Sequence, residues 1–200
     1  MLRFILPIIL IFITTTASAE ETYAHSLNLN LLLSSEEIQE KVTEYGKILS
    51  EDYRDKKVTM VMIMKGAACF ATDLFREMSI DISLDYIRCS SYGQNGTHKG
   101  ELTISGVENL DIKGKHVLIV DDICDSGSTF LAVLEQLKKK NPQSLATVAL
   151  LTRKESTAPY HPDYSLFAID KEAFVVGYGL DYKERYRNLQ GIYFFAKMPR

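Results

Sequence analysis

Residues 117–129, VLIVDDICDSGST, pass from four aliphatic side chains directly to two adjacent carboxylates, and then to a third acid and a group of hydroxyls around a glycine. Four apolar residues in succession, with no polar alternation, are typical of a strand that is buried on both faces. Beyond the hydroxyls, Phe130, Val133, Leu134 and Leu137 recur at helical spacing. The segment therefore predicts a buried strand, a polar loop and a helix in direct succession.

Similar apolar runs alternate with helical patterns along the rest of the chain. Ser34 and Glu37 have the spacing of a capping box and open a predicted helix. Another helix is predicted over residues 67–78, and further strands over 58–64, 81–89, 145–152 and from 174 onward. Strands without polar alternation that are separated by helices predict an α/β fold, with a mostly parallel sheet covered by helices on both faces.

Length and composition are those of one soluble globular domain. The chain has 200 residues, of which 46% are hydrophobic and 24% charged, with a net charge of −3. A net negative charge gives no support for bulk electrostatic binding to nucleic acid, although a small polyanion could still be bound by a few local donors. Cys69, Cys89 and Cys124 have neither a disulfide framework nor zinc-site spacing, so we expect small buried side chains in a reducing compartment.

The first nineteen residues have the pattern of a secretory signal. Arg3 precedes an apolar run over 4–13, and Ala17-Ser18-Ala19 matches a cleavage site. The run is shorter than the ~20 apolar residues that span a bilayer, so no stable membrane span is expected. We divide the chain into an N-terminal extension, residues 1–25, and one globular domain, residues 26–200. The signal pattern favours export, whereas the cysteines favour the cytoplasm.

The loop at 121–129 has the chemistry of a ribose phosphate site. Ser126-Gly127-Ser128-Thr129 stands where a helix begins, so hydroxyls and unpaired backbone N–H groups can bind a phosphate. Asp121 and Asp122 cannot serve that anion; they suit sugar hydroxyls or Mg²⁺. The alternative is that the loop only caps the helix while both acids face solvent. No G-x-x-x-x-G-K-[ST] or G-x-G-x-x-G motif is present.

VLIVDDICDSGST resembles the phosphoribosyl-pyrophosphate (PRPP) motif of the type I phosphoribosyltransferases. The flanking order is similar to that of the hypoxanthine-guanine phosphoribosyltransferases of purine salvage, over about residues 27–196. Met64-Lys65-Gly66 resembles their pyrophosphate loop, Ser91-Tyr92-Gly93 their mobile lid, and Phe174–Tyr182 their purine segment. The resemblance implies the type I fold, with a small hood built from terminal segments. It also implies Mg²⁺-dependent transfer of phosphoribose from PRPP to hypoxanthine or guanine, forming IMP or GMP, by homodimers or homotetramers in the cytoplasm.

The resemblance also implies a role for each matching residue. Asp125 faces purine N7 as the catalytic proton acceptor, and Phe174 stacks on the base. The remaining implied roles are Asp121 and Asp122 for the ribose hydroxyls and Mg²⁺; Ser126, Gly127, Ser128 and Thr129 for the 5′-phosphate; Lys65, Gly66 and Arg187 for pyrophosphate; Ser91 and Tyr92 for the lid; Val175 for the purine 2-position; and Asp181 beside Mg²⁺ and pyrophosphate.

One departure from the branch bears on the base. Arg153 stands where the branch has a lysine that contacts the purine 6-oxo group, and Lys154 follows it. Either cation can donate to an oxo group and neither to an amino group, so 6-oxopurines are expected rather than adenine. The choice between the two cations, and the preference among hypoxanthine, guanine and xanthine, stay open. The alternative function is a nucleotide-sensing or RNA-binding regulator on the same fold.

Overall fold

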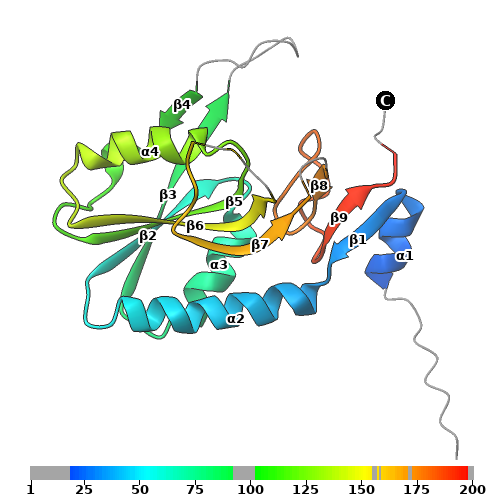
Figure 1. The fold of residues 1–200 in the computed structure, drawn as a ribbon, viewed down its shortest axis with the longest axis horizontal. Helices are drawn as coiled ribbons and strands as arrows, with labels where there is room; N and C mark the ends of the chain where they lie inside the picture. Colours follow the sequence, from blue (N-terminus) through cyan, green and yellow to red (C-terminus); the bar gives the residue numbers. More distant parts are fainter. Residues whose placement is uncertain (1–18, 92–101, 155–156, 158, 171–172, 198–200) are drawn as a thin grey trace, which may run out of the picture.

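The computed structural model describes residues 19–91, 102–154, 157, 159–170 and 173–197, which form a large sheet with helices on its faces and a smaller sheet beside it (Figure 1). The strands are β1 Leu29–Leu33, β2 Val58–Met64, β3 Ile82–Ser91, β4 Leu102–Ser105, β5 His116–Cys124, β6 Ser144–Arg153, β7 Tyr164–Ile169, β8 Val175–Val176 and β9 Ile192–Phe195. The helices are α1 Ala19–Ser26, α2 Ser35–Asp52, α3 Ala68–Glu77, the short 3-10 turn η1 Val107–Asn109, and α4 Ser128–Lys138.

The large sheet has the strand order β4-β3-β2-β5-β6-β7, and every neighbouring pair is parallel except β3 and β4. The predicted class, an α/β fold with a mostly parallel sheet, is therefore confirmed. The central strand β5 lies between β2 and β6, with Val120 opposite Met62 on one side and opposite Val148 on the other. This register brings the carboxyl ends of the three strands to one edge of the sheet.

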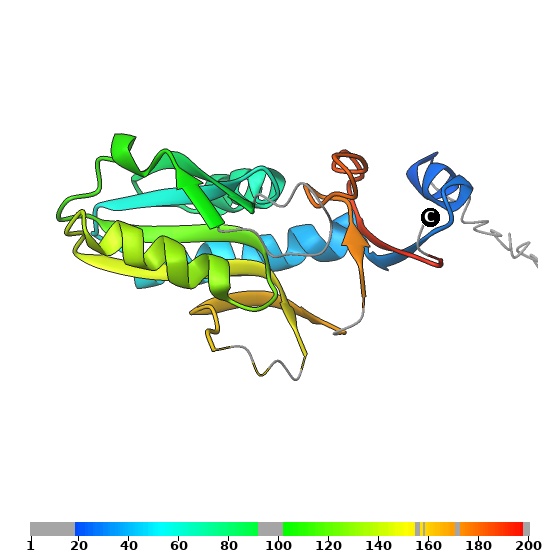
Figure 2. The ribbon, with the colours of Figure 1, turned by 90° about the horizontal axis from the view of Figure 1, so that it is seen from above.

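Helices cover both faces of this sheet (Figure 2). On one face, Ile38, Val42 and Leu49 of α2 pack with α3 against alternate residues of β2, β5 and β6. On the other face, Phe130 and Leu137 of α4 pack against the intervening residues of the same strands. The capping box predicted for α2 is present, because Ser34 Oγ accepts from Glu37 N and Ser34 N donates to the Glu37 carboxylate.

The smaller sheet is a hood built from both ends of the described chain. Its strands are antiparallel in the order β1-β9-β8, and α1 lies against it (Figure 1). Val175, Tyr178, Leu180 and Ile192 of the hood belong to the same buried cluster as α2 and α3, so hood and large sheet share one core.

The described structure starts inside the predicted N-terminal extension, residues 1–25. Glu20 of α1 accepts three hydrogen bonds at Oε1, from Gln190 N, Gly191 N and the Tyr193 hydroxyl. Residues 1–18 lie outside the described residues, so the signal-like pattern stays a prediction. Within the described part of the chain, no helix is both long enough and apolar enough to cross a membrane.

Candidate active site

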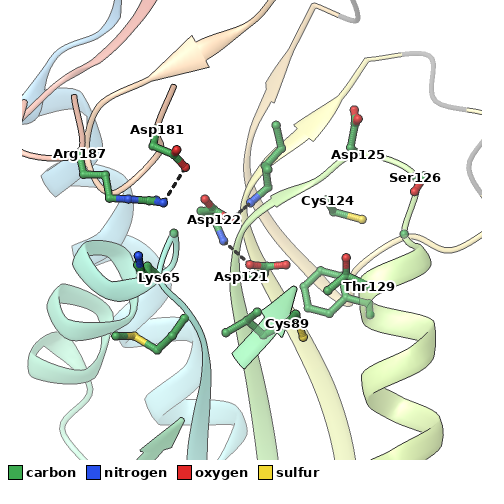
Figure 3. Close-up of a pocket in the computed structure, with 16 residues that line it drawn as sticks. Lys65, Cys89, Asp121, Asp122, Cys124, Asp125, Ser126, Thr129, Asp181 and Arg187 are labelled. Atoms are coloured by element: carbon green, nitrogen blue, oxygen red, sulfur yellow. Dashed lines mark hydrogen bonds and ion pairs between the residues drawn. The ribbon is translucent and has the colours of Figure 1, made fainter. Parts of the chain in front are cut away.

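A cavity of about 350 Å³ opens at the carboxyl ends of β2, β3 and β5 (Figure 3). Ten of the residues expected at a site line it: Lys65, Gly66, Asp121, Asp122, Asp125, Ser126, Gly127, Thr129, Asp181 and Arg187. Ser128, Arg153, Lys154, Phe174 and Val175 do not line it. Ser91 ends β3 with its side chain outside the described set, and Tyr92 lies outside the described residues altogether.

Two adjacent carboxylates form the floor of the cavity. Asp121 is only 6% exposed, and its Oδ1 accepts a 3.0 Å hydrogen bond from Asp122 N; Asp122 Oδ1 accepts one of 3.0 Å from Ile123 N. Burial, and then repulsion by Asp122, raises the pKa of Asp121 well above its usual value. Burial also raises the pKa of Asp122. No described residue forms an ion pair with either acid, so a ligand that brings hydroxyl donors or a cation would relieve this cost.

The thiols in this region are poor nucleophiles. Burial, helped by the negative charge of Asp121, raises the pKa of Cys89 to about 12. Burial also raises the pKa of Cys69 and of Cys124. All three are free thiols, and Cys89 and Cys124 line the cavity. Since the thiolate is the reactive form, the cysteines offer no nucleophile at neutral pH.

The loop before α4 is built to bind an anion. Gly127 has φ 72°, and a Cβ there would lie 2.7 Å from the Tyr160 carbonyl oxygen, so only glycine fits. Gly127 is also the N-cap of α4 and supplies no capping side chain; of the first-turn N–H groups, that of Ser128 makes a long, 3.4 Å hydrogen bond to Ser126 Oγ. Ser126 Oγ lies 2.8 Å from Ser128 Oγ. The close packing that requires the glycine is thus against Tyr160, and the hydroxyls and N–H groups at the start of α4 are donors that an anion can use.

Asp125 stands at the rim, where Arg153 holds it. Arg153 Nε donates to Asp125 Oδ1 at 2.8 Å, and Arg153 Nη1 donates to the carbonyls of Asp170 at 3.0 Å and Ala173 at 2.6 Å. Lys154 points elsewhere, and its Nζ pairs with the Asp170 carboxylate at 3.0 Å. The structure therefore brings Arg153 and Asp125 together and leaves Lys154 out of the arrangement.

The opposite wall carries the cations. Arg187 Nη1 donates to the Gly179 carbonyl at 2.6 Å, and Arg187 Nη2 lies 2.7 Å from Asp181 Oδ1 (Figure 3). Arg187 Nε is the one buried side-chain polar atom, among the described residues, without a hydrogen-bond partner. Lys65 Nζ lies 2.9 Å from Glu184 Oε2, and this hydrogen bond lowers the pKa of Glu184. The wall can therefore receive a polyanion that takes the place of Glu184 beside Lys65 and Arg187.

Glycines let the two walls approach each other. A Cβ at Gly66 would lie 1.9 Å from Asp122 Oδ2, and a Cβ at Gly179 would lie 2.2 Å from the Gly66 carbonyl oxygen. Gly179 also has φ 100°, a conformation that other residues rarely adopt. The loop at 65–66 is thus held between the acids of β5 and the turn that follows β8.

Phe174 and Val175, which are expected to bind a purine, are not part of the cavity lining. Phe174 is 43% exposed, and its ring makes an edge contact with the ring of Tyr182, with 5.7 Å between the centroids. Val175 is buried in β8 and pairs with Phe194 of β9. An exposed aromatic face held by a second ring can stack on a planar base.

Among the described residues, no cluster of three acids, histidines or cysteines could hold a metal ion by itself. Asp121 and Asp122 lie together, whereas Asp181 is across the cavity in its ion pair with Arg187. Mg²⁺ usually takes one or two carboxylates together with substrate oxygens and water. The acids present therefore fit an ion that binds together with a phosphorylated substrate.

Sequence reasoning gave no individual role to Glu184, Gly179 or Glu20. Glu184 pairs with Lys65 across 119 positions of sequence, and a single sequence carries no signal of such a contact. Its spacing of three from both Asp181 and Arg187 could have suggested a local cluster. The sequence carries no signal of the contact between Gly179 and Gly66, and Glu20 lies in the predicted N-terminal extension.

Comparison with known proteins identifies the same architecture. The model of the phosphoribosyl transferase domain matches residues 31–183, more than half of the chain. The hypoxanthine-guanine phosphoribosyltransferase of Mycobacterium avium is 36% identical over 185 residues, which cover 89% of this chain and 90% of that protein. The crystal structure of a hypoxanthine phosphoribosyltransferase from Staphylococcus aureus superposes with a TM-score of 0.77 at 36% identity, covering 86% of this chain and 94% of that one.

Some relatives are much longer than this chain. The bifunctional protein TilS/HprT of Listeria innocua is 38% identical over 160 residues, which cover 80% of this chain but 24% of that protein. The chain thus spans about a quarter of the length of these bifunctional relatives.

Proposed function

The chain belongs to the phosphoribosyl transferase domain family, among the hypoxanthine-guanine phosphoribosyltransferases, and on that premise we propose how its residues carry out the transfer. The reaction is purine salvage: phosphoribose passes from PRPP to N9 of hypoxanthine or guanine, which gives IMP or GMP and pyrophosphate. The observation that carries the proposal is a single cavity with acids on its floor, an anion-binding loop at one end and cations at the other.

The ribose 5-phosphate half of PRPP binds along β5. The 5′-phosphate accepts hydrogen bonds from the 126–129 loop, whose N–H groups and hydroxyls are donors at a helix N-terminus. The ribose 2′- and 3′-hydroxyls donate to Asp121 and Asp122, which accept no hydrogen bond from any other described side chain. Phosphate and diol are thereby bound at opposite ends of one short segment.

The pyrophosphate half binds at the opposite wall. Lys65, the Gly66 amide and Arg187 receive it, and their donors stabilise the negative charge that develops on the leaving oxygen as the C1′–O bond breaks. Arg187 is held in place through Gly179 and Asp181 before any ligand arrives. Preorganised donors of this kind need little rearrangement during the reaction.

The base binds over Phe174, with the Val175 backbone at its 2-position. Asp125 accepts the proton that the purine loses, through N7, as N9 forms its bond to C1′. Arg153 already holds Asp125 through Nε, and its Nη2 atom makes no hydrogen bond with a described residue, so we assign Nη2 to the purine 6-oxo group. The lid that begins at Ser91 and Tyr92 closes over the reacting atoms and excludes water, which would otherwise intercept C1′.

Enzymes of this family are generally Mg²⁺-dependent. Asp121 and Asp122 would hold the ion on the ribose side and Asp181 on the pyrophosphate side, where it would supply positive charge to the oxygens of PRPP. Because Mg²⁺ usually takes only one or two carboxylates together with substrate phosphate oxygens and water, it should bind more tightly in the presence of PRPP than alone.

Incubation of the full chain with PRPP, Mg²⁺ and each of hypoxanthine, guanine, xanthine and adenine tests the reaction. We expect nucleotide from hypoxanthine and guanine and none from adenine. Absence of product with every base would refute the enzyme and leave the nucleotide-sensing or RNA-binding alternative. Fastest turnover of xanthine would establish the xanthine-preferring alternative instead.

The same proposal covers assembly and location. We infer a homodimer or homotetramer, and Leu84 and Tyr86, both exposed on β3, are apolar side chains that a subunit contact would bury. Analytical ultracentrifugation would show a monomer if this is wrong.

We place the enzyme in the cytoplasm, where PRPP is made; mass spectrometry showing a native chain that begins at Glu20 would overturn that location.

A further inference from the structure

The two cations assigned to pyrophosphate already share an anion of the protein itself. Glu184 Oε2 lies 2.9 Å from Lys65 Nζ and 3.4 Å from Arg187 Nη2. The Glu184 backbone N–H donates to Asp181 Oδ2 at 2.9 Å, which fixes the start of this side chain beside Arg187. One carboxylate thus bridges the two sides of the pyrophosphate wall, from the loop after β2 to the segment after β8.

We propose that Glu184 is an internal competitor of the pyrophosphate group: it pairs with Lys65 and Arg187 while no pyrophosphate is bound, and releases both when PRPP binds. The inference rests on the proposed function, because it takes Lys65 and Arg187 as the pyrophosphate ligands. It assigns Glu184 to the control of PRPP affinity and of product release.

The contact is of a kind that a polyanion can displace. The side chains of Glu184 and Lys65 are 65% and 50% exposed, and ion pairs this exposed contribute little free energy. Pyrophosphate carries more negative charge than one carboxylate and more acceptor oxygens, so it makes stronger charge-assisted hydrogen bonds with both cations. Among the described residues, the Glu184 side chain accepts hydrogen bonds only from Lys65 and Arg187. It can therefore rotate into solvent once these two bonds are broken.

Arg187 keeps its position when Glu184 leaves. Its Nη1 bond to the Gly179 carbonyl and its pair with Asp181 do not involve Glu184. The exchange therefore moves one exposed acid and leaves the arginine oriented. After transfer, the same acid competes for the cations again, which weakens the hold on the pyrophosphate product and favours its release.

The test compares Glu184→Gln with Glu44→Gln in the full chain. Glu44 is an exposed acid in an ion pair with Lys41 on α2, so its variant is a matched control for the loss of one surface charge. The quantities measured are the KM for PRPP, the inhibition constant of magnesium pyrophosphate as product inhibitor, and the KM for hypoxanthine. For E184Q we expect the first two to fall about 2- to 5-fold, in keeping with an exposed ion pair, and the third to stay unchanged. E44Q should change none of them.

Lys65→Ala and the double variant complete the experiment. If Lys65 binds pyrophosphate, K65A raises the KM for PRPP, and the effect of E184Q becomes smaller in the K65A background because one of its two partners is gone. A raised KM in K65A together with an unchanged or raised KM in E184Q overturns the competitor and leaves the proposed function standing. Unchanged PRPP and pyrophosphate constants in both K65A and Arg187→Ala overturn the pyrophosphate assignment, and the competitor with it.

Discussion

Arg153 and Asp125 form an ion pair of 2.8 Å in which the arginine is 13% exposed and the acid 70%. The guanidinium also donates to the carbonyls of Asp170 and Ala173, just before Phe174. One side chain thus joins the proposed proton acceptor at the end of β5 to the segment that leads to the base. A lysine, the residue of the related branch at this position, has no planar fork with which to make these contacts at once.

Replacement of Arg153 should affect the kinetic constants for the purine base more than the KM for PRPP. Arg153→Ala removes charge-assisted hydrogen bonds worth about 1.5–3 kcal/mol, so we expect a ~10- to 100-fold loss of kcat/KM for hypoxanthine, with the KM for PRPP nearly unchanged. Arg153→Lys should recover part of the loss, because it keeps the charge. Lys154→Ala is the matched control, since Lys154 pairs with the exposed Asp170 carboxylate. Equal losses in R153A and K154A would contradict the assignment.

Asp125→Asn keeps the size of the side chain and removes the proton acceptor. General bases typically contribute ~10²–10⁴-fold to a rate, so we expect kcat to fall by that range while the KM for PRPP changes little. Thermal unfolding of D125N should stay close to that of the parent, because Asp125 is exposed and is not part of the core. A turnover number within about 3-fold of the parent enzyme would rule Asp125 out as the base.

Asp121→Asn should stabilise the protein while weakening PRPP binding. The pKa of Asp121 is raised in the folded chain, chiefly by burial, from an ordinary value of 3.8. A carboxyl of this kind holds its proton more tightly when folded, so its ionisation lowers the free energy of unfolding as pH rises from 3.8 through the folded pKa. Asparagine does not titrate. The variant should therefore gain stability over the parent as pH rises, on the order of 1 kcal/mol, or ~2–4 °C in Tm.

Thermal melts from pH 3.5 to pH 8 without ligand measure this difference. Asp111→Asn is the control, because Asp111 is an exposed acid in an ion pair with Lys115. The difference in Tm between D111N and the parent should not grow with pH as it does for D121N. A Tm of D121N that falls further below the parent at higher pH would show that the buried carboxylate stabilises the fold.

The parts of the fold that sequence predicted are local ones. β2, α4 and the 121–129 loop follow the expected pattern, because a run of apolar residues and the helical spacing of Phe130, Val133 and Leu137 lie within one stretch of chain. The strands of the hood were harder to predict from the sequence. β8 has two residues and β9 has four, and each is stabilised by pairing with segments far away in sequence. Length alone gives such strands too little pattern to detect.

The candidate site also has a part that the sequence predicts and a part that it does not. Asp121, Asp122 and the 126–129 loop lie in one continuous segment, so their shared chemistry was visible from order alone. The wall that carries Lys65 and Arg187 depends on contacts between the loop after β2 and the segment after β8, such as Lys65 with Glu184 and Gly66 with Gly179. Backbone packing of this kind appears only in three dimensions, and Arg153 could be assigned to Asp125 only once β5 and β6 were seen side by side.

Glu20 connects the N-terminal helix to the loop that carries Arg187. Its Oε1 accepts from Gln190 N at 2.8 Å, Gly191 N at 3.0 Å and the Tyr193 hydroxyl at 3.0 Å. In Glu20→Ala, two backbone N–H groups lose their acceptor, at a cost of about 1–3 kcal/mol in all, so we expect a Tm lower by several degrees. The KM for PRPP should rise a few-fold, because the 187–191 loop is less well held, while the KM for hypoxanthine stays the same.

Glu20→Gln separates the hydrogen bonds from the charge, because its amide oxygen can accept the same three bonds. It should restore most of the Tm and of the PRPP affinity. Tyr193→Phe removes one donor and leaves both backbone bonds, so its Tm should fall less than that of E20A. These melts and rates are measured on the full chain. If E20A has the same Tm as the parent and binds PRPP equally well, α1 does not position the loop, and the contacts of Arg187 with Gly179 and Asp181 are enough to orient it.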